Sequence, residues 1–165
     1  MTDQLTIRKA TVDDVGIISH LAQVIWPPTY NEILSQAQIG YMMNLFYSAE
    51  SLAGQFKKHH FILAVLNEQP VGFASYSTMD EACIYKLHKL YVRTDTQGKG
   101  LGKALIHYIL DEISSLQAKA LDLNVNRSNK ARMFYEKLGF TVIREENIDI
   151  GQGFWMTDYV MRREV

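Results

Sequence analysis

Three glycines lie close together in the segment Gln97-Gly98-Lys99-Gly100-Leu101-Gly102, directly before an amphipathic stretch that predicts a helix. Glycine lets a bound anion approach the backbone closely, and the first N–H groups of a helix face the positive end of the helix dipole. The segment therefore predicts a phosphate-binding loop. Its spacing matches neither the P-loop nor the dinucleotide fingerprint G-x-G-x-x-G, and the alternative is that the glycines only form a tight turn into the helix.

A second reactive group is the single cysteine, Cys83. One cysteine forms no disulfide within the chain, and it lacks the Cys and His neighbours of a zinc site. No histidine is evidently placed to activate it as a nucleophile. We expect no metal and a reducing, cytoplasmic location.

The elements that position these residues follow from the hydrophobic pattern. Alternating or continuous apolar runs predict strands, and apolar residues at helical spacing predict helices. Thr11, Ser35 and Ser48 are candidate N-caps, and Pro27 with Pro28 is expected to end the first helix. The expected strands are 5–7, 61–66, 71–76, 84–92, 121–125, 140–150 and 154–161, and the expected helices are 12–26, two between 30 and 58, 101–116 and 128–138.

These elements indicate one mixed α/β domain over residues 1–165, a usual length for a single domain. The apolar fraction of 47% and charged fraction of 21% are those of a globular protein. Seventeen Lys and Arg stand against eighteen Asp and Glu, so the basic surface of a nucleic-acid-binding domain is not expected. No run is apolar and long enough to span a bilayer, and the start lacks a signal-peptide pattern, so no membrane partner is expected.

Two blocks of this sequence resemble the GNAT superfamily of N-acetyltransferases. Leu90-Tyr91-Val92 followed by the Gln97–Gly102 loop resembles the Q/R-x-x-G-x-G/A coenzyme A signature, and residues 129–140 resemble the later A-x-x-x-Y-x-x-x-G-F block. The resemblance implies an α+β fold with a central, mixed, mostly antiparallel twisted sheet of about six to seven strands and helices on both faces. It also implies acetyl-CoA as the co-substrate. A looser similarity, in the helical segment and the closing strand, is to bacterial polyamine acetyltransferases of the spermidine/spermine type.

The resemblance implies a set of coenzyme-binding residues. The strand residues would pair with the pantetheine arm, and the loop would surround the pyrophosphate. Lys99 is alternatively a solvated charge. The full set is Leu90, Tyr91, Val92, Gln97, Gly98, Lys99, Gly100, Leu101, Gly102, Lys103 and Asn129.

Tyr135 matches the family tyrosine that is proposed to protonate the leaving thiolate; alternatively it is a core tyrosine. Many relatives carry a coenzyme-holding asparagine seven residues before this tyrosine. Here Ser128 stands at that position and Asn129 follows it. Which of the two takes that role stays open.

His88 is the candidate general base, because an amine must lose its proton before it attacks a thioester. Some relatives have a glutamate at this position, and the arylalkylamine acetyltransferases have a histidine. An imidazole with an ordinary pKa near 6.5 suits a base at neutral pH. Alternatively His88 faces solvent near Lys86 and Lys89, or a water chain serves as the base; the other histidines have no such placement.

The resemblance places acceptor specificity in two aromatic segments, 26–32 and 151–159. Trp26, Tyr30, Glu32 and Trp155 are the candidate acceptor-binding residues, with Asp158 a further source of negative charge. Aromatic faces hold cations, which favours a polyamine or an aralkylamine. Alternatively these rings pack in the core or in a dimer.

The sequence thus predicts an N-acetyltransferase that moves acetyl directly to the primary amine of a small molecule. Two alternatives remain: a protein or peptide N-acetyltransferase, and a non-catalytic acyl-CoA-binding sensor. A homodimer is a further expectation, with the apolar end at residues 159–161 pairing across a two-fold axis.

Overall fold

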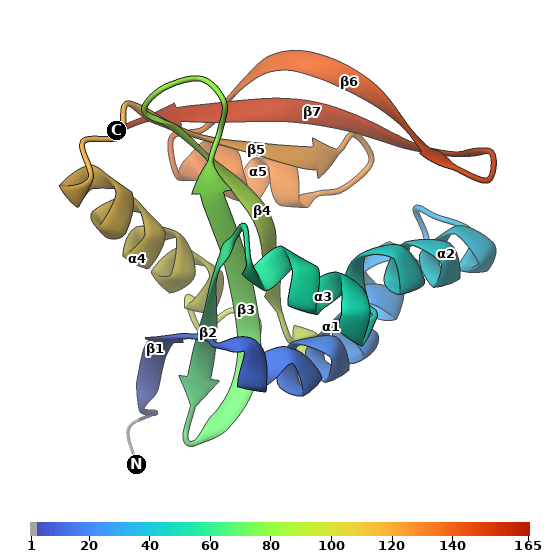
Figure 1. Cartoon of the computed structure of the whole chain (residues 1–165), viewed down its shortest axis with the longest axis horizontal. Coiled ribbons are helices and arrows are strands. Elements are labelled where there is room, and N and C mark those ends of the chain that lie inside the picture. The colour runs from blue at the N-terminus through green and yellow to red at the C-terminus, as the bar shows by residue number, and fades with distance from the viewer. Residues whose placement is uncertain (1–2) are drawn as a thin grey trace. The chain divides into compact units, whose positions relative to one another are not determined.

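Residues 3–165 are described by a computed structural model, in which strands and helices follow one another as Figure 1 shows. The strands are β1 Leu5–Lys9, β2 His60–Leu66, β3 Gln69–Thr78, β4 Ile84–Val92, β5 Ala120–Asn126, β6 Thr141–Gly151 and β7 Phe154–Glu164. The helices are α1 Val15–Tyr30, α2 Gln36–Tyr47, α3 Ala49–Phe56, α4 Leu101–Ser115 and α5 Ala131–Lys137, with short 3-10 turns at Val12–Asp14 and Thr94–Thr96.

The seven strands form one sheet in the order β1-β2-β3-β4-β5-β7-β6. Pairing is antiparallel between β1 and β2, β2 and β3, β5 and β7, and β6 and β7, whereas β4 and β5 run parallel. The expected mixed, mostly antiparallel α+β sheet is confirmed. Residues 159–161 lie on β7, which is paired on both sides, so this segment offers no free edge for the expected pairing across a two-fold axis.

The chain divides into two compact units, of which the first comprises residues 1–77 and 89–109. Its three N-terminal helices contact one another, and Figure 1 shows them in blue to green. The ring of Phe56 at the end of α3 stacks on Phe61 of β2 with centroids 4.3 Å apart. Burial of such rings and of neighbouring aliphatic side chains stabilises this unit.

Helix α1 continues through Pro27 and Pro28, so the predicted end at the prolines is wrong. Each proline removes one backbone donor, but the turn that follows the prolines keeps its own hydrogen bonds. The hydroxyl of Thr29 donates to the Ile25 carbonyl at 2.7 Å, and the N–H of Asn31 donates to the Pro27 carbonyl at 2.9 Å. The last turn, which carries Tyr30, is therefore kept.

The predicted caps of the next two helices are confirmed. The Ser35 hydroxyl accepts from the Gln38 N–H at 3.1 Å, and the Ser48 hydroxyl accepts from the Ser51 N–H at 3.2 Å. Each bond satisfies one N–H of the first turn, which otherwise has no partner within its helix. Ser35 thus caps the start of α2, and Ser48 divides residues 36–56 into two helices.

The second unit comprises residues 78–88 and 110–165. Asp122 of β5 lies opposite Arg162 of β7, and the guanidinium binds both carboxylate oxygens, at 2.7 Å and 2.9 Å. The residue Asp122 is only 2% exposed. Helix α5 begins at Ala131 instead of the expected 128, because the Asn129 side chain turns the chain first by accepting from the Ala131 N–H at 2.9 Å.

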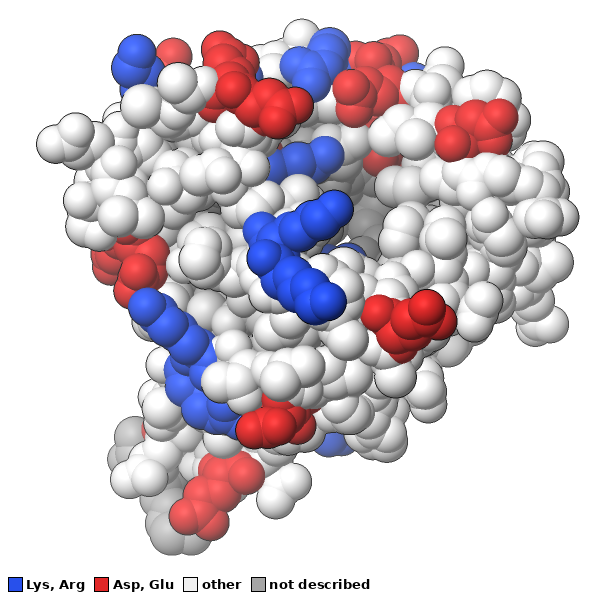
Figure 2. Space-filling view, viewed as in Figure 1, with Lys and Arg blue, Asp and Glu red and all other residues white. Residues whose placement is uncertain are grey.

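Charges of both signs are interspersed on the face of the molecule that Figure 2 shows. Mixed charge of this kind lacks the basic stripe that follows a phosphate backbone. Within residues 3–165, no helix combines the length and the hydropathy needed to cross a membrane. In the same part of the chain, no group of three or more His, Cys, Asp and Glu residues is arranged to hold a metal ion.

Candidate active site

The glycine loop lies in the first unit between the Thr94–Thr96 turn and α4. Gly98 and Gly100 have φ angles of 88° and 74°, in the left-handed region that side chains disfavour. An added Cβ at either position would meet no atom within 4 Å, so the backbone conformation, not space, requires glycine there. The N–H of Ala104 donates to the Gly100 carbonyl at 3.0 Å, which leaves the earlier N–H groups without a partner inside the helix.

The loop is exposed and carries the predicted coenzyme-binding Lys99, and Lys103 follows it in the first turn of α4. The Lys99 ammonium lies 3.2 Å from a carboxylate oxygen of Asp3. Both side chains are about half exposed, at 48% and 51%, so the pair contributes little to stability. A phosphate group could therefore compete for Lys99 at small cost.

The end of β4 is held in place by a close approach of β3. A Cβ on Gly72 would lie 2.8 Å from the Tyr91 carbonyl oxygen and 3.3 Å from the Val92 Cα. The Arg93 N–H also donates to the Val71 carbonyl at 2.8 Å. Gly72 thus fixes the backbone of the predicted pantetheine strand, a role that the sequence pattern did not indicate.

Gly72→Ala is expected to push this strand outward and to raise the KM for acetyl-CoA. The clash involves backbone atoms that cannot rotate away, so we expect a loss of about 1–3 kcal/mol in the free energy of unfolding. Gly54→Ala is the matched control, because a Cβ there meets nothing within 4 Å and alanine favours a helix. Chemical denaturation and coenzyme titration measure both effects; equal behaviour of the two variants would contradict the assignment.

Two of the predicted acceptor-binding residues lie in an aromatic cluster of the first unit. Trp26 and Tyr30 are 4% and 9% exposed, and the Tyr30 and Tyr91 hydroxyls lie 2.9 Å apart. The Trp26 ring centroid lies 4.6 Å from Tyr30, 5.5 Å from Tyr47 and 5.7 Å from Tyr91. Phe73 also contacts Tyr47 and Tyr91. This burial is what the core-packing alternative expects, and it links the acceptor candidates to the coenzyme strand.

Lys89 adjoins the same cluster, and its burial could not be predicted from the neighbouring residues. Lys89 is 9% exposed, and its ammonium lies 5.0 Å from the Tyr47 ring centroid and 5.7 Å from the Phe46 ring centroid. Burial lowers the pKa of Lys89 to about 8. Among residues 3–165, no carboxylate pairs with it.

The pKa of Lys89 predicts a pH dependence of stability. Because that pKa is about 8 when folded and about 10.4 when unfolded, the unfolded state binds more protons between these values. The protonated form therefore destabilises the fold by about 3 kcal/mol, and stability should rise from pH 8 toward pH 10. Denaturation of wild type and Lys89→Met at pH 7 and pH 9.5 tests this; a constant difference between the two proteins would contradict it.

His88 lies on β4 in the second unit. The neighbours Leu87 and Lys89 are buried, whereas Lys86, His88 and Leu90 are partly exposed. Because side chains alternate along a strand, His88 shares its face with Lys86 and Leu90. This settles the facing that the sequence left open, and the imidazole stays a proposed base.

Tyr135 is buried on α5 in the second unit, with 8% of its surface exposed. Its ring centroid lies 5.3 Å from Phe134 and 5.8 Å from Phe140. Gly139 ends the helix at a φ of 92°, and the Phe140 N–H donates back to the Tyr135 carbonyl at 3.1 Å. The ring therefore packs against two other rings, and its role as proton donor stays a prediction.

The two candidates for the coenzyme-holding position differ in what their side chains do. The Asn129 amide oxygen accepts from the Ala131 N–H, so it caps α5. Ser128 is exposed, and its N–H donates to the Asn126 amide oxygen at 2.9 Å. The capping bond uses one acceptor of Asn129, and a coenzyme contact by its amide NH2 group stays a prediction.

A pair of carboxylates lies across β5, β6 and β7 in the second unit. The Asn124 amide donates to Glu146 and to Asp158, both at 3.1 Å. Asp158 is 3% exposed, and burial raises its pKa, whereas the Asn124 hydrogen bond lowers the pKa of Glu146. A buried carboxyl with a raised pKa is suited to accept a proton from an amine, so Asp158 is a second candidate base.

The remaining acceptor candidates and Cys83 are exposed. Glu32 follows α1, and Trp155 of β7 is 50% exposed. Cys83 is exposed, with a free thiol. Trp155 lies in the second unit, and Trp26, Tyr30 and Glu32 lie in the first.

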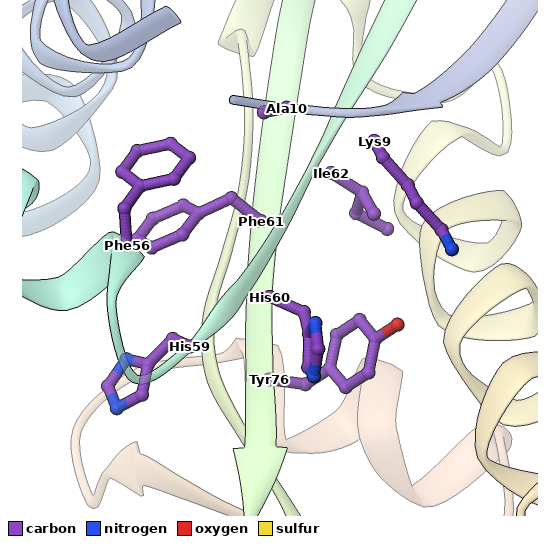
Figure 3. A pocket seen from close by; sticks show the side chains of 8 residues that line it. All are labelled: Lys9, Ala10, Phe56, His59, His60, Phe61, Ile62 and Tyr76. Carbon is purple, nitrogen blue, oxygen red and sulfur yellow. The ribbon is translucent and has the colours of Figure 1, made fainter. Parts of the chain in front are cut away.

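A separate hollow of about 170 Å³ lies in the first unit around the start of β2. Figure 3 shows His60 beside Tyr76, with Phe56, Phe61 and His59 on the other side of the strand. The His60 and Tyr76 ring centroids are 5.2 Å apart. None of the eight lining residues belongs to the predicted coenzyme or acceptor set, so these two histidines stay outside the candidate site.

The comparison with protein families decides what kind of site this is. The acetyltransferase (GNAT) domain family matches residues 32–163, which include the glycine loop and Tyr135. The chain belongs to the GNAT acetyltransferase family. This confirms the resemblance at the level of the family.

Individual relatives cover less of the sequence. The ribosomal protein bS18-alanine N-acetyltransferase of Haemophilus influenzae is 36% identical over 78 residues, which are 47% of this chain and 51% of that protein. The chain thus spans about half the length of this curated relative. It spans 38% of the length of an N-acetyltransferase of Methanocaldococcus jannaschii.

Solved GNAT structures match nearly the whole fold. The PaiA N-acetyltransferase of Thermoplasma acidophilum, crystallised with coenzyme A, has a TM-score of 0.83 at 24% identity, with 98% of this chain and 99% of that one covered. The ribosomal-protein-S18-alanine N-acetyltransferase of Escherichia coli has a TM-score of 0.74 at 21% identity, covering 98% and 94%. At these identities the likeness establishes the fold.

Proposed function

We propose that this GNAT protein is an acetyl-CoA-dependent N-acetyltransferase that moves acetyl directly to the primary amine of a small molecule. The observation that carries the proposal is the loop of two left-handed glycines leading into α4, within a chain of the GNAT family. Such a loop holds the pyrophosphate of coenzyme A by backbone N–H groups and the helix dipole. No metal takes part in the proposed reaction.

The proposed reaction needs three contributions from the chain. A base, His88 or Asp158, removes the proton of the acceptor ammonium, directly or through water. Backbone N–H groups of β4 near Tyr91 stabilise the oxyanion that forms when the amine attacks the thioester carbonyl. Tyr135 then protonates the departing thiolate, and no covalent enzyme intermediate forms.

The acceptor class is the least constrained part of the proposal. The cation-binding ring faces expected of Trp26 and Tyr30 are mostly buried, whereas Glu32 and Trp155 are exposed. A polyamine or aralkylamine is therefore supported by the exposed residues more than by the buried ones. We propose a cytoplasmic location, where acetyl-CoA is present and the free thiol of Cys83 stays reduced.

A second candidate is acetylation of a protein N-terminus. It is favoured by the relatives from Haemophilus influenzae and Escherichia coli, whose names give the alanine of ribosomal protein S18 as the acceptor. The same loop, strand and tyrosine would serve either acceptor. Only the acceptor-binding segments would differ.

A thiol-release assay with acetyl-CoA separates these candidates. The panel contains polyamines, aralkylamines, amino acids and peptides with a free N-terminal alanine. Turnover of small amines supports the first candidate, and turnover of peptides alone supports the second. Tight acetyl-CoA binding with no turnover of any acceptor would overturn both and favour an acyl-CoA sensor.

A further inference from the structure

Lys89 is a buried cation for which the described chain supplies aromatic rings and no anion. A charged group that leaves water loses several kcal/mol of solvation unless a partner of opposite charge replaces it. The ring centroids of Phe46 and Tyr47 lie 5.7 Å and 5.0 Å from the ammonium. Their cation–π attraction replaces part of the lost solvation energy. No ion pair within residues 3–165 replaces the rest, which is unusual for a lysine that is only 9% exposed.

A second buried donor lies in the same cluster. The indole Nε1 of Trp26 is buried next to the Tyr47 side chain and makes no hydrogen bond of good geometry within residues 3–165. Trp26 and Lys89 both contact the ring of Tyr47. Its centroid lies 5.5 Å from the Trp26 ring centroid and 5.0 Å from the Lys89 ammonium. Buried donors almost always have an acceptor in folded proteins. The weakly paired Trp26 donor, in one cluster with a lysine that no described carboxylate neutralises, therefore indicates that an acceptor arrives with a ligand.

The position of Lys89 indicates which ligand this is. It directly precedes Leu90 on the strand that is proposed to hold the pantetheine arm, and it shares a strand face with Tyr91, two residues further on. Tyr91 in turn contacts the acceptor candidates Trp26 and Tyr30. An anion that reached Lys89 would therefore belong to the acceptor molecule, near the acetyl group that it receives.

We propose that Lys89 is a specificity-determining residue that binds a carboxylate of the acceptor, so that the preferred substrate is a small primary amine that also carries a carboxylate. The proposal rests on the proposed function, because it names the acceptor class of the same site. Within the proposed small amines, it favours carboxylate-bearing acceptors over simple polyamines, whose positive charges the Lys89 ammonium would repel. The low exposure of Lys89 strengthens the attraction between its ammonium and a carboxylate.

The test compares acceptors that differ only in the carboxylate. Linear ω-amino acids of increasing chain length are each paired with the alkylamine that lacks the carboxylate, and phenylalanine is paired with phenethylamine. For wild type we expect at least one carboxylate-bearing amine to have a kcat/KM about tenfold or more above that of its partner without the carboxylate. This is the expected effect of one charge-assisted hydrogen bond. A wild-type enzyme that prefers every alkylamine would overturn the proposal.

Lys89→Met tests the residue itself. We expect this variant to lose the preference for carboxylates and to leave the KM for acetyl-CoA within about twofold, since the coenzyme is not expected to contact this side chain. Lys58→Met makes the same change at an exposed lysine of the same unit and should keep the wild-type preference. Retention of the preference by Lys89→Met would overturn the proposal.

Failure of the proposed function would look different, because no amine of either kind would then be acetylated by any of the three proteins. Binding would still decide the role of Lys89. Calorimetric titration with N-acetylphenylalanine and with N-acetylphenethylamine requires no turnover. Tighter binding of the carboxylate by wild type and Lys58→Met, but not by Lys89→Met, supports the proposal; equal binding of the two compounds by wild type overturns it.

Discussion

Tyr135→Phe is expected to lower kcat by about 100-fold or more with saturating acetyl-CoA, which is the usual contribution of a general acid. The change removes one oxygen atom from a ring held between Phe134 and Phe140. The ring packing remains, so the free energy of unfolding should change by less than about 1.5 kcal/mol, the net contribution of one hydrogen bond. The measurement is the initial rate of thiol release with the best acceptor found, together with thermal unfolding of the same sample.

A matched control exists for this change in the same unit. Tyr85 of β4 is as buried as Tyr135, at 8% exposure, and it has no proposed role in the reaction. Tyr85→Phe should therefore keep the wild-type rate. If Tyr135→Phe also keeps half of the wild-type rate or more, the leaving thiolate takes its proton from another group, and Tyr135 is a core residue only.

Asp122→Asn is expected to be the most destabilising of the conservative changes, by about 3 kcal/mol in the free energy of unfolding. The carboxylate is 2% exposed and binds Arg162 through both oxygens. Breaking a buried pair by neutralising one partner leaves the other without compensation. Urea unfolding at pH 7 measures the loss.

Asp95→Asn is the control for burial. Asp95 also accepts from one arginine through both oxygens, at 3.1 Å and 2.8 Å, but its side chain is 62% exposed. Exposed pairs contribute about 0–1 kcal/mol, so this variant should unfold almost like wild type. Equal losses in the two variants would show that burial does not govern the strength of these pairs.

Local signals in the sequence predicted most of the elements. Ser35 and Ser48 act within one helical turn, so their capping could be predicted from neighbouring residues alone. The same holds for the left-handed glycines of the loop. The prolines misled the prediction, because the helix continues past them with the bonds of Thr29 and Asn31 in its last turn.

Features that depend on contacts between distant segments could not be predicted. The pairing of Asp122 with Arg162 joins residues 40 apart and follows from the register of β5 and β7. The close approach of Gly72 to Tyr91 depends on two strands meeting backbone to backbone. Lys89 resembled a solvated lysine because nothing nearby in the sequence indicates that α2 covers it.

The central claim is that the chain itself transfers acetyl from acetyl-CoA to an amine. The most direct measurement supplies acetyl-CoA labelled with ¹³C in the acetyl group and follows the amine product by mass spectrometry while the free thiol is quantified. We predict labelled amide and free thiol in equal amounts, with multiple turnovers per enzyme. Bound coenzyme with neither product, for every acceptor in the panel, would contradict the claim.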